Sequence, residues 1–332
     1  MREFSLEFLA LSVGVFLLTV LAEWRLIPVL RSHKAGQRIL EIGPRWHKAK
    51  EGTPTMGGIG FILAALIGAS AFFILRAVHG TAMTEVPLAL TLAFAVGNGA
   101  IGFVDDYCKL VKKQNEGLTW YQKLILQIAV AAAYVSVMSY MGFVDTSVDL
   151  PFSSKAWELG WFFYPVSILV LVGVVNGGNL TDGIDGLASS VTFVIGGLFA
   201  LVAFAWRDPS VGLVSAILLG ATLGFLVYNF HPAKVFMGDT GSLFLGALVI
   251  GGAFMLRAHF VGLILCGVFI FEMLSSFLQV IYFKLTHGKR LFRMAPFHHH
   301  LEKCGWNEYA IVAFFTTCEI LLRILGWFAL GV

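Results

Sequence analysis

The chain has 332 residues, of which 58% are hydrophobic and only 13% charged, and its formal net charge is +3. A soluble domain carries roughly 25% charged residues, so this composition excludes a protein whose surface is mostly hydrated. No block of like charges or low-complexity tract indicates a nucleic-acid-binding protein.

Ten apolar segments are long enough to cross a bilayer as helices, which takes about 20 residues each. They lack the alternation of apolar and polar residues that is typical of a membrane β-barrel. The expected spans are 4–30, 57–78, 86–104, 121–143, 159–176, 187–206, 211–230, 241–256, 260–284 and 307–330. The sequence therefore predicts an all-α polytopic integral membrane protein, folded as a single domain over residues 1–332.

The basic residues are divided unequally between the two sets of loops. Most loop lysines and arginines follow the first, third, fifth, seventh and ninth spans, whereas the opposite loops and their edges hold Arg76, Lys155, Arg207 and Arg257. By the positive-inside rule, the first set of loops is cytoplasmic. With ten spans, both termini are then expected outside.

The polar motifs all fall in or beside these cytoplasmic loops. In chain order they are HKAKEGTPTMGG (47–58), FVDDYCKLVKK (103–113), TWYQK (119–123), VNGGNLTDGIDGLA (175–188), YNFHPAKVFMGDTGS (228–242) and RLFRMAPFHHHLEKCGWNE (290–308). Because they share one side of the membrane, we expect them to form one site.

Carboxylates at a membrane boundary are costly unless they are hydrated, paired or bound to a metal. One such residue could simply cap a helix. Here five aspartates come from three motifs that also supply lysine and asparagine, and histidines follow in a later motif: Asp105, Asp106, Asp182, Asp185 and Asp239. We interpret the set as a functional site.

An oxygen-rich group of side chains suits Mg²⁺, which takes one or two carboxylates together with substrate phosphates. The four cysteines (Cys108, Cys266, Cys304 and Cys318) are scattered, which does not favour a zinc site or a disulfide framework. Mg²⁺ with lysine is the recurring apparatus of phosphoryl transfer. Neither a Walker motif nor a kinase glycine loop is present, so the expected substrate is a diphosphate handled at the membrane face.

Several motifs resemble those of a known superfamily. DDxxK at Asp105–Lys109, NxxNxxDGxDGLA at Asn176–Ala188 and FMGDTGS at Phe236–Ser242 resemble the polyprenyl-phosphate hexose-1-phosphate transferases. Within that superfamily, HxxKxGTPTMGG at His47–Gly58 and RMAPFHHHLEKCGWNE at Arg293–Glu308 resemble the phospho-N-acetylmuramoyl-pentapeptide transferases of peptidoglycan synthesis. The resemblance extends over essentially the whole chain.

The resemblance implies a reaction and a location. UDP-MurNAc-pentapeptide and undecaprenyl phosphate would give lipid I and UMP, with Mg²⁺ required, at the cytoplasmic face of the bacterial inner membrane. A homodimer is compatible with the resemblance, although the sequence shows no interface signature.

The resemblance also implies roles for individual residues. Asp239 is the expected magnesium ligand, and Asp105 the group that deprotonates or orients the lipid phosphate. Asp106 supports the site, through Lys123 or the metal, and which of Asp105 and Asp106 acts as base stays open. His298 is expected to be essential. The implied substrate contacts are Lys50, Thr55, Lys109, Lys123, Asn176, Asn179, Asp182, Asp185, Asn229, Phe236, His299 and His300.

Two mechanisms are compatible with these residues: direct attack of the lipid phosphate on the β-phosphate, or a two-step route through a covalent aspartyl intermediate. A phosphate monoester has a second pKa near 6 and is already largely anionic at neutral pH, which favours direct displacement.

Two other functions fit part of the pattern. A relative that uses UDP-GlcNAc would share DDxxK and the NxxNxxDGxDG loop, but the RMAPFHHHLEKCGW segment argues against it. A secondary transporter also uses broken helices and buried acids, but near the midplane of the membrane. Most acids here lie at one face. Glu319 is an exception that could pair with Arg323 four residues later, and Glu272 is another, with no evident partner and no expected catalytic role.

Overall fold

The computed structural model describes residues 2–32, 50, 52–80, 85–112, 117–150, 155–257 and 259–330. The motif residue His47 lies outside this part of the chain. The helices are α1 (Arg2–Ser32), α2 (Gly58–Val78), α3 (Val86–Lys112), α4 (Trp120–Tyr140), α5 (Phe163–Thr181), α6 (Leu187–Trp206), α7 (Pro209–Asn229), α8 (Gly238–Met255), α9 (His259–Leu265), α10 (Gly267–Leu285), α11 (Phe297–Lys303) and α12 (Glu308–Leu330). Two short strands, β1 (Ser147–Asp149) and β2 (Ala156–Glu158), pair antiparallel.

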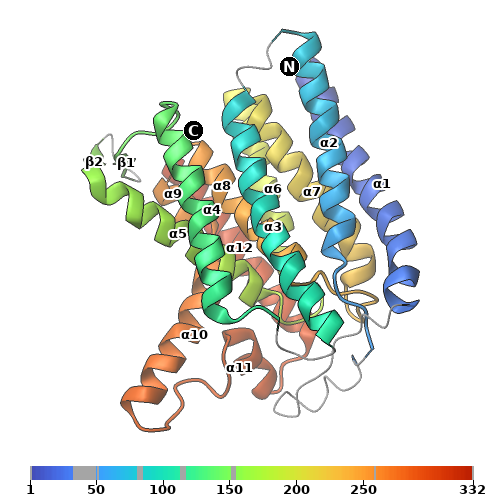
Figure 1. The fold of residues 1–332 in the computed structure, drawn as a ribbon, viewed down its shortest axis with the longest axis vertical. Coiled ribbons are helices and arrows are strands. Elements are labelled where there is room, and N and C mark those ends of the chain that lie inside the picture. Colours follow the sequence, from blue (N-terminus) through green and yellow to red (C-terminus); the bar gives the residue numbers. More distant parts are fainter. Residues whose placement is uncertain are drawn as a thin grey trace.

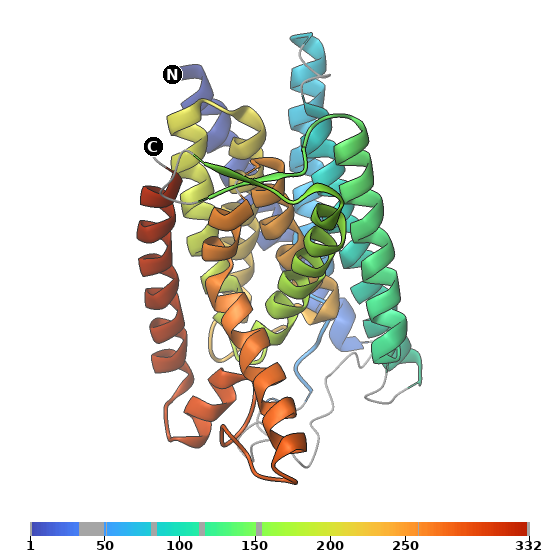
Figure 2. The same ribbon diagram turned by 90° about the vertical axis from the view of Figure 1, so that its left-hand side faces the viewer.

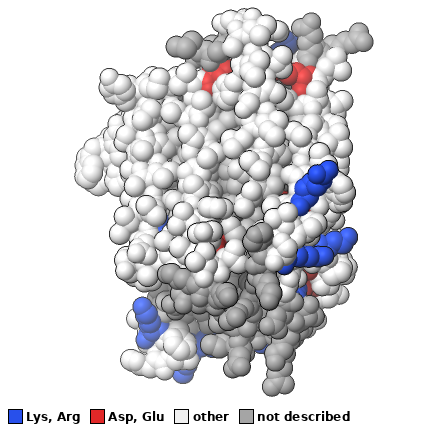
Figure 3. Space-filling view, turned by 45° about the vertical axis from the view of Figure 1, so that its right-hand side comes forward, with Lys and Arg blue, Asp and Glu red and all other residues white. Residues whose placement is uncertain are grey.

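Ten of the described helices are long and apolar enough to cross a membrane, which confirms the predicted polytopic all-α class. They run between two ends of an elongated bundle (Figures 1 and 2). The start of α1, the end of α12 and the β1–β2 hairpin lie at one end, and α11 lies at the other. Uncharged residues cover the broad middle of the face shown in Figure 3, as expected for a surface in contact with lipid.

Helix α8 forms the centre of the bundle. Every residue from Thr240 to Phe254 is buried, and α8 packs most extensively against α3 and α5. Its glycines allow this close packing, because a side chain at Gly246 would press on the backbone of Val175 in α5. The first turn of α8 is thereby held between the two helices that carry the aspartate and asparagine motifs.

The predicted span 260–284 is interrupted in the structure. Helix α9 ends at Leu265 and α10 begins at Gly267. The predicted pair of Glu319 and Arg323 on α12 is confirmed and stabilises this break. Arg323 donates to the carbonyl of Leu265, and Glu319 accepts from the N–H of Val268 at 3.3 Å. An interrupted helix is tolerated at membrane depth when its free backbone groups are bonded in this way.

Helices α3, α5 and α8 extend further into the motifs than expected. The predicted spans stopped at 104 and 176 and began at 241, whereas α3 ends at Lys112, α5 ends at Thr181 and α8 begins at Gly238. Polar motif residues therefore lie on helices whose positions are fixed by packing, and the break between α5 and α6 comprises only residues 182–186.

Candidate active site

Three carboxylates converge where α3 meets α8. Asp105 and Asp106 lie in the C-terminal part of α3, and Asp239 lies in the first turn of α8. The helices come close because residue 102 is glycine, and a Cβ atom there would collide with the carbonyl of Asp239. One carboxylate oxygen from each aspartate lies within 4.8 Å of the other two.

Two lysines face this carboxylate cluster. Lys109 Nζ lies 2.6 Å from Asp105 Oδ2 and 3.2 Å from Asp239 Oδ2. Lys123 Nζ, from the first turn of α4, lies 2.7 Å from Asp239 Oδ2. The cluster keeps an excess of acidic groups over ammonium groups, and its ligands are oxygens from rigid helices. This set of donors fits Mg²⁺.

Asp106 connects the two helices. Its Oδ2 accepts from the N–H of Thr240 at 2.9 Å and from the Thr240 hydroxyl at 2.7 Å, and its Oδ1 accepts from the N–H of Asp239 at 3.3 Å. The side chain therefore satisfies N–H groups in the first turn of α8, where a negative charge also interacts favourably with the helix dipole. The ion pair of Lys123 is made with Asp239, so Asp106 supports the site through α8 itself.

Every oxygen of the three carboxylates accepts a hydrogen bond or an ion pair. Asp105 Oδ1 accepts from the N–H of Leu118 at 2.8 Å, and Asp105 Oδ2 faces Lys109. Asp239 Oδ1 accepts from Asn179 Nδ2 at 2.9 Å, opposite the two lysines on Oδ2. The carboxylates are thus held in fixed orientations.

The two motif asparagines of α5 have different surroundings. Asn179 reaches Asp239 and also donates to the hydroxyl of Ser242 at 2.8 Å. Asn176, one turn earlier, donates to Gln127 of α4 at 2.8 Å, and Gln127 donates back at 3.5 Å. Asn176 therefore links α4 to α5 one turn away from the carboxylates.

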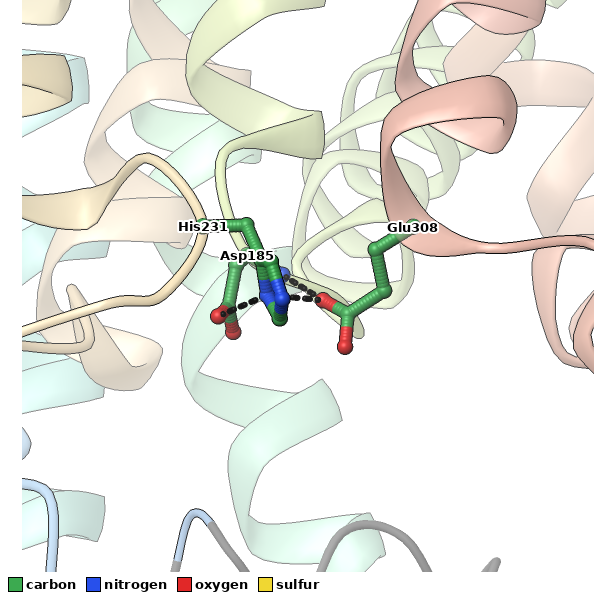
Figure 4. A group of neighbouring side chains, drawn as sticks. All are labelled: Asp185, His231 and Glu308. Carbon is green, nitrogen blue, oxygen red and sulfur yellow. Dashed lines mark hydrogen bonds and ion pairs between the residues drawn. The ribbon is translucent and has the colours of Figure 1, made fainter.

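A second group of acidic and basic residues is drawn in Figure 4. Asp185, His231 and Glu308 come from the α5–α6 loop, the loop after α7 and the start of α12. Lys50 Nζ lies 2.7 Å from Asp185 Oδ1 and 2.8 Å from Glu308 Oε2. His231 Nδ1 lies 2.9 Å from Asp185 Oδ2, which also accepts from the N–H of Ala233 at 2.9 Å. Asp185 thus connects four segments that are remote in the sequence.

Three further motif residues join neighbouring loops. Asn229 is buried, accepts from the N–H of Gly186 at 3.1 Å and donates to the carbonyl of Val235 at 3.0 Å. Phe236 is half-buried and forms backbone hydrogen bonds with residues 54 and 57. Thr55 lies beside Gly238, at the start of α8. These three predicted substrate contacts therefore lie in or beside the loops that lead into α8.

Asp182, at the end of α5, is the one aspartate of the predicted five whose side chain forms no hydrogen bond with the residues that the structure describes. Burial is the main cause that raises the pKa of Asp182 well above its usual range. The carboxylates of Asp239, Asp106 and Asp185 raise it further. Asp182 is therefore suited to hold a proton or to meet a bound cation.

The raised pKa of Asp182 predicts that the stability of the folded protein depends on pH. Because the pKa is higher in the folded chain than in the unfolded chain, the folded state loses stability as pH rises from the ordinary aspartate pKa toward the raised one. In EDTA, the Tm of Asp182→Asn minus that of wild type should increase between pH 5 and pH 8. Asp145→Asn is the control, because hydrogen bonds from Ser147 lower the pKa of Asp145. Its Tm difference should stay constant over this range, and a constant difference for Asp182→Asn would contradict the assignment.

The three consecutive histidines of α11 point to different partners. His298 is fully buried, and its Nδ1 lies 3.0 Å from Glu272 Oε2 of α10. His299 Nδ1 lies 2.6 Å from Glu302 Oε2. His300 Nδ1 accepts from the N–H of Arg293 at 3.1 Å, and its ring stacks on Phe297. The run is therefore built into the fold, as expected for a positioned site.

Sequence reasoning missed the partners that hold these residues. Glu272 had no partner in the sequence, and Gln127 and Glu308 were given no role. His231 and Glu308 belong to motifs that were recognised as polar, so the motifs themselves were the available signal. Gln127 lies one helical turn after Lys123, and nothing local distinguishes it.

Comparisons with known proteins agree with the motifs. A family model described as glycosyl transferase family 4 matches residues 88–257, slightly more than half of the chain. A phospho-N-acetylmuramoyl-pentapeptide-transferase from Halalkalibacterium halodurans and one from Bacillus subtilis are each 44% identical, over 94% of this chain and 94% of the relative. The chain belongs to the phospho-N-acetylmuramoyl-pentapeptide-transferase family. One from Clostridium kluyveri is 43% identical, over 92% of this chain and 93% of the relative.

Membership of the phospho-N-acetylmuramoyl-pentapeptide-transferase family confirms the resemblance predicted from the motifs. The chain is a transferase and a multi-pass membrane protein. The match to the family model begins at residue 88, within α3, and ends beyond α8, so it includes the whole carboxylate cluster. The alignments to the first two relatives span 94% of the chain, so they extend beyond that region to α10 and α11.

Proposed function

We propose that the chain transfers the phospho-MurNAc-pentapeptide unit of UDP-MurNAc-pentapeptide to undecaprenyl phosphate, giving lipid I and UMP. The observation that carries the proposal is the convergence of Asp105, Asp106 and Asp239 with Lys109 and Lys123 at one end of a membrane bundle. Phosphoryl transfer needs little beyond positioning and charge neutralisation, and these residues supply both.

Asp239 would hold Mg²⁺, with the oxygens of Asp105 and Asp106 close by. When bound, the ion supplies neutralisation of the charge that builds up on the diphosphate. Lys109 and Lys123 then interact with phosphate oxygens from the side of α3 and α4, and Asn179 keeps Asp239 in its orientation. Asp105 orients the lipid phosphate or accepts its proton.

We favour direct displacement over a covalent aspartyl intermediate. The lipid phosphate is already largely anionic at neutral pH, so a strong base is not required. Each oxygen of the three clustered aspartates also accepts a hydrogen bond or an ion pair. A nucleophilic aspartate would first have to give these up. In the direct route, the acceptor oxygen bonds to the β-phosphorus as the bond to the UMP oxygen breaks.

The identity of the donor substrate can be tested by comparing two UDP-sugars in the same assay. The purified protein should form lipid-linked product from UDP-MurNAc-pentapeptide, and excess UDP-GlcNAc should not compete with it. Product formed from UDP-GlcNAc would indicate the related acetylglucosamine transferases. Movement of intact UDP-MurNAc-pentapeptide across a vesicle membrane, without release of UMP, would indicate a transporter.

Glu308 is expected to matter for donor binding. It holds Lys50, a proposed substrate contact, and accepts from the N–H of Asp185 at 3.1 Å. Glu308→Gln removes the charge that fixes Lys50, so the KM for the donor should rise about tenfold, which corresponds to about 1.4 kcal/mol, while kcat changes little. Glu158→Gln in the hairpin at the other end is the control and should leave KM unchanged. An unchanged KM for Glu308→Gln would show that Glu308 does not contribute to donor binding.

We place the site at the cytoplasmic face of the bacterial inner membrane, with both termini outside. The support is the concentration of lysine and arginine in the loops on the side of the site. Modification of single cysteines introduced at Lys234 and Lys155, in spheroplasts and inverted vesicles, tests this orientation. The single domain and a homodimer stay proposals, and light scattering of the detergent complex measures the assembly.

A further inference from the structure

The buried residue Glu272 is bound to the first of the three histidines at two points. Glu272 and His298 are both completely buried, on α10 and α11. Glu272 Oε1 accepts from the backbone N–H of His298 at 3.2 Å, and Oε2 faces His298 Nδ1 at 3.0 Å. Ser275, nearly one turn later on α10, accepts from the N–H of Phe297 at 3.0 Å. Helix α10 therefore fixes the start of α11.

The donor and acceptor roles in this contact depend on the tautomer of His298. With Glu272 as a carboxylate, which offers only acceptors, Nδ1 is the donor, whether the ring is neutral or charged. A carboxylate that binds one ring nitrogen in this way fixes the tautomer and orientation of the imidazole and leaves the other nitrogen for chemistry.

The other nitrogen, Nε2, is directed toward the α5–α6 loop. It is buried and has no hydrogen-bond partner among the described residues. A Cβ atom at Gly183 would collide with Nε2, so the ring lies directly on this loop, at the glycine that follows Asp182. A buried polar atom without a partner is destabilising, and a ligand that supplies the missing hydrogen bond would relieve this cost.

We propose that Glu272 is a positioning residue, which holds His298 so that Nε2 forms a hydrogen bond with the sugar-diphosphate part of the donor at the α5–α6 loop. The proposal rests on the proposed function for the identity of this donor. The arrangement of the two side chains does not depend on it. Glu272 does not contact the substrate and acts through His298.

The test begins with Glu272→Gln, which keeps the volume of the side chain. An amide replaces one of the two acceptor oxygens with a donor NH₂ group, so it cannot reproduce the two separate contacts with His298. We expect kcat to fall about 10- to 100-fold, with the KM for undecaprenyl phosphate unchanged. Glu272→Asp keeps both acceptors and should recover part of the activity. Glu23→Gln is the matched control, because Glu23 is equally buried and its carboxylate has no hydrogen-bond partner among the described residues.

A spectroscopic readout separates this role from a merely structural one. In protein labelled with ¹⁵N-histidine, the His298 signal, assigned by its loss in His298→Ala, should show a protonated Nδ1 in wild type. The signal should change in Glu272→Gln protein that is folded. A wild-type signal with unprotonated Nδ1, or unchanged kcat in folded Glu272→Gln, would overturn the proposal. Because the NMR arm needs no activity, it also gives an answer for a protein that fails to release UMP.

Discussion

Asp239→Asn is expected to lower kcat by about 100- to 1000-fold, on the scale of losing one preorganised electrostatic group in an active site. Asparagine keeps the shape of the side chain but removes the charge that faces Lys109 and Lys123 and that would hold Mg²⁺. Both lysines would then lose an ion-pair partner close to the phosphates. UMP release at saturating concentrations of both substrates measures the effect.

The control for Asp239→Asn is the same substitution at Asp208. Asp208 caps α7 at the other end of the bundle, where it accepts from the N–H of Ser210 at 2.8 Å. Asparagine is an equally good N-cap, so folding and activity should be retained. Folded Asp239→Asn with kcat within tenfold of wild type would show that the carboxylate cluster is not the catalytic centre.

Gly102→Ala is expected to be the second most damaging change, although it adds a single methyl group. The new Cβ would collide with backbone atoms of Asp239 and Thr240, which cannot rotate away as a side chain could. Helix α3 would have to move from α8, and this would separate Asp105 and Asp106 from Asp239. A misplacement of about 1 Å costs about 100-fold in rate, and overpacking costs about 1–3 kcal/mol of stability.

Gly197→Ala on α6 is the matched control. Among the residues that the structure describes, no atom lies within 4 Å of a Cβ atom there, and alanine favours a helix more than glycine does. Its Tm and activity should equal or exceed those of wild type. If Gly102→Ala gave the same result, the close packing of α3 and α8 would not be what brings the carboxylates together.

The helical spans could be predicted because an apolar run of sufficient length has few alternatives in a bilayer. The interruption at Cys266 could not be predicted, since 260–284 reads as one continuous apolar run. What allows the break is Glu319 and Arg323 on α12, more than 50 residues away. The extension of α5 to Thr181 likewise depends on packing that glycine-rich sequence does not reveal.

In the site, too, residues marked by local sequence could be predicted, whereas contacts between remote segments could not. The five aspartates were recognisable because acids are costly at a membrane boundary and these share one side. Several of their partners were not recognisable, because these contacts join segments that are separate in the sequence: Lys50 to Asp185, and Leu118, beyond the end of α3, to Asp105. Glu272 is the clearest case. It looked like an isolated buried acid until the fold placed it against His298.

The most direct test of the account is the requirement for each component in UMP release by the wild-type protein in detergent. Reactions would contain UDP-MurNAc-pentapeptide with undecaprenyl phosphate and Mg²⁺, and then omit each in turn. We expect UMP only in the complete reaction, with one lipid I formed per UMP. UMP released without the lipid phosphate would contradict direct displacement, and no UMP from folded protein in the complete reaction would contradict the proposed function.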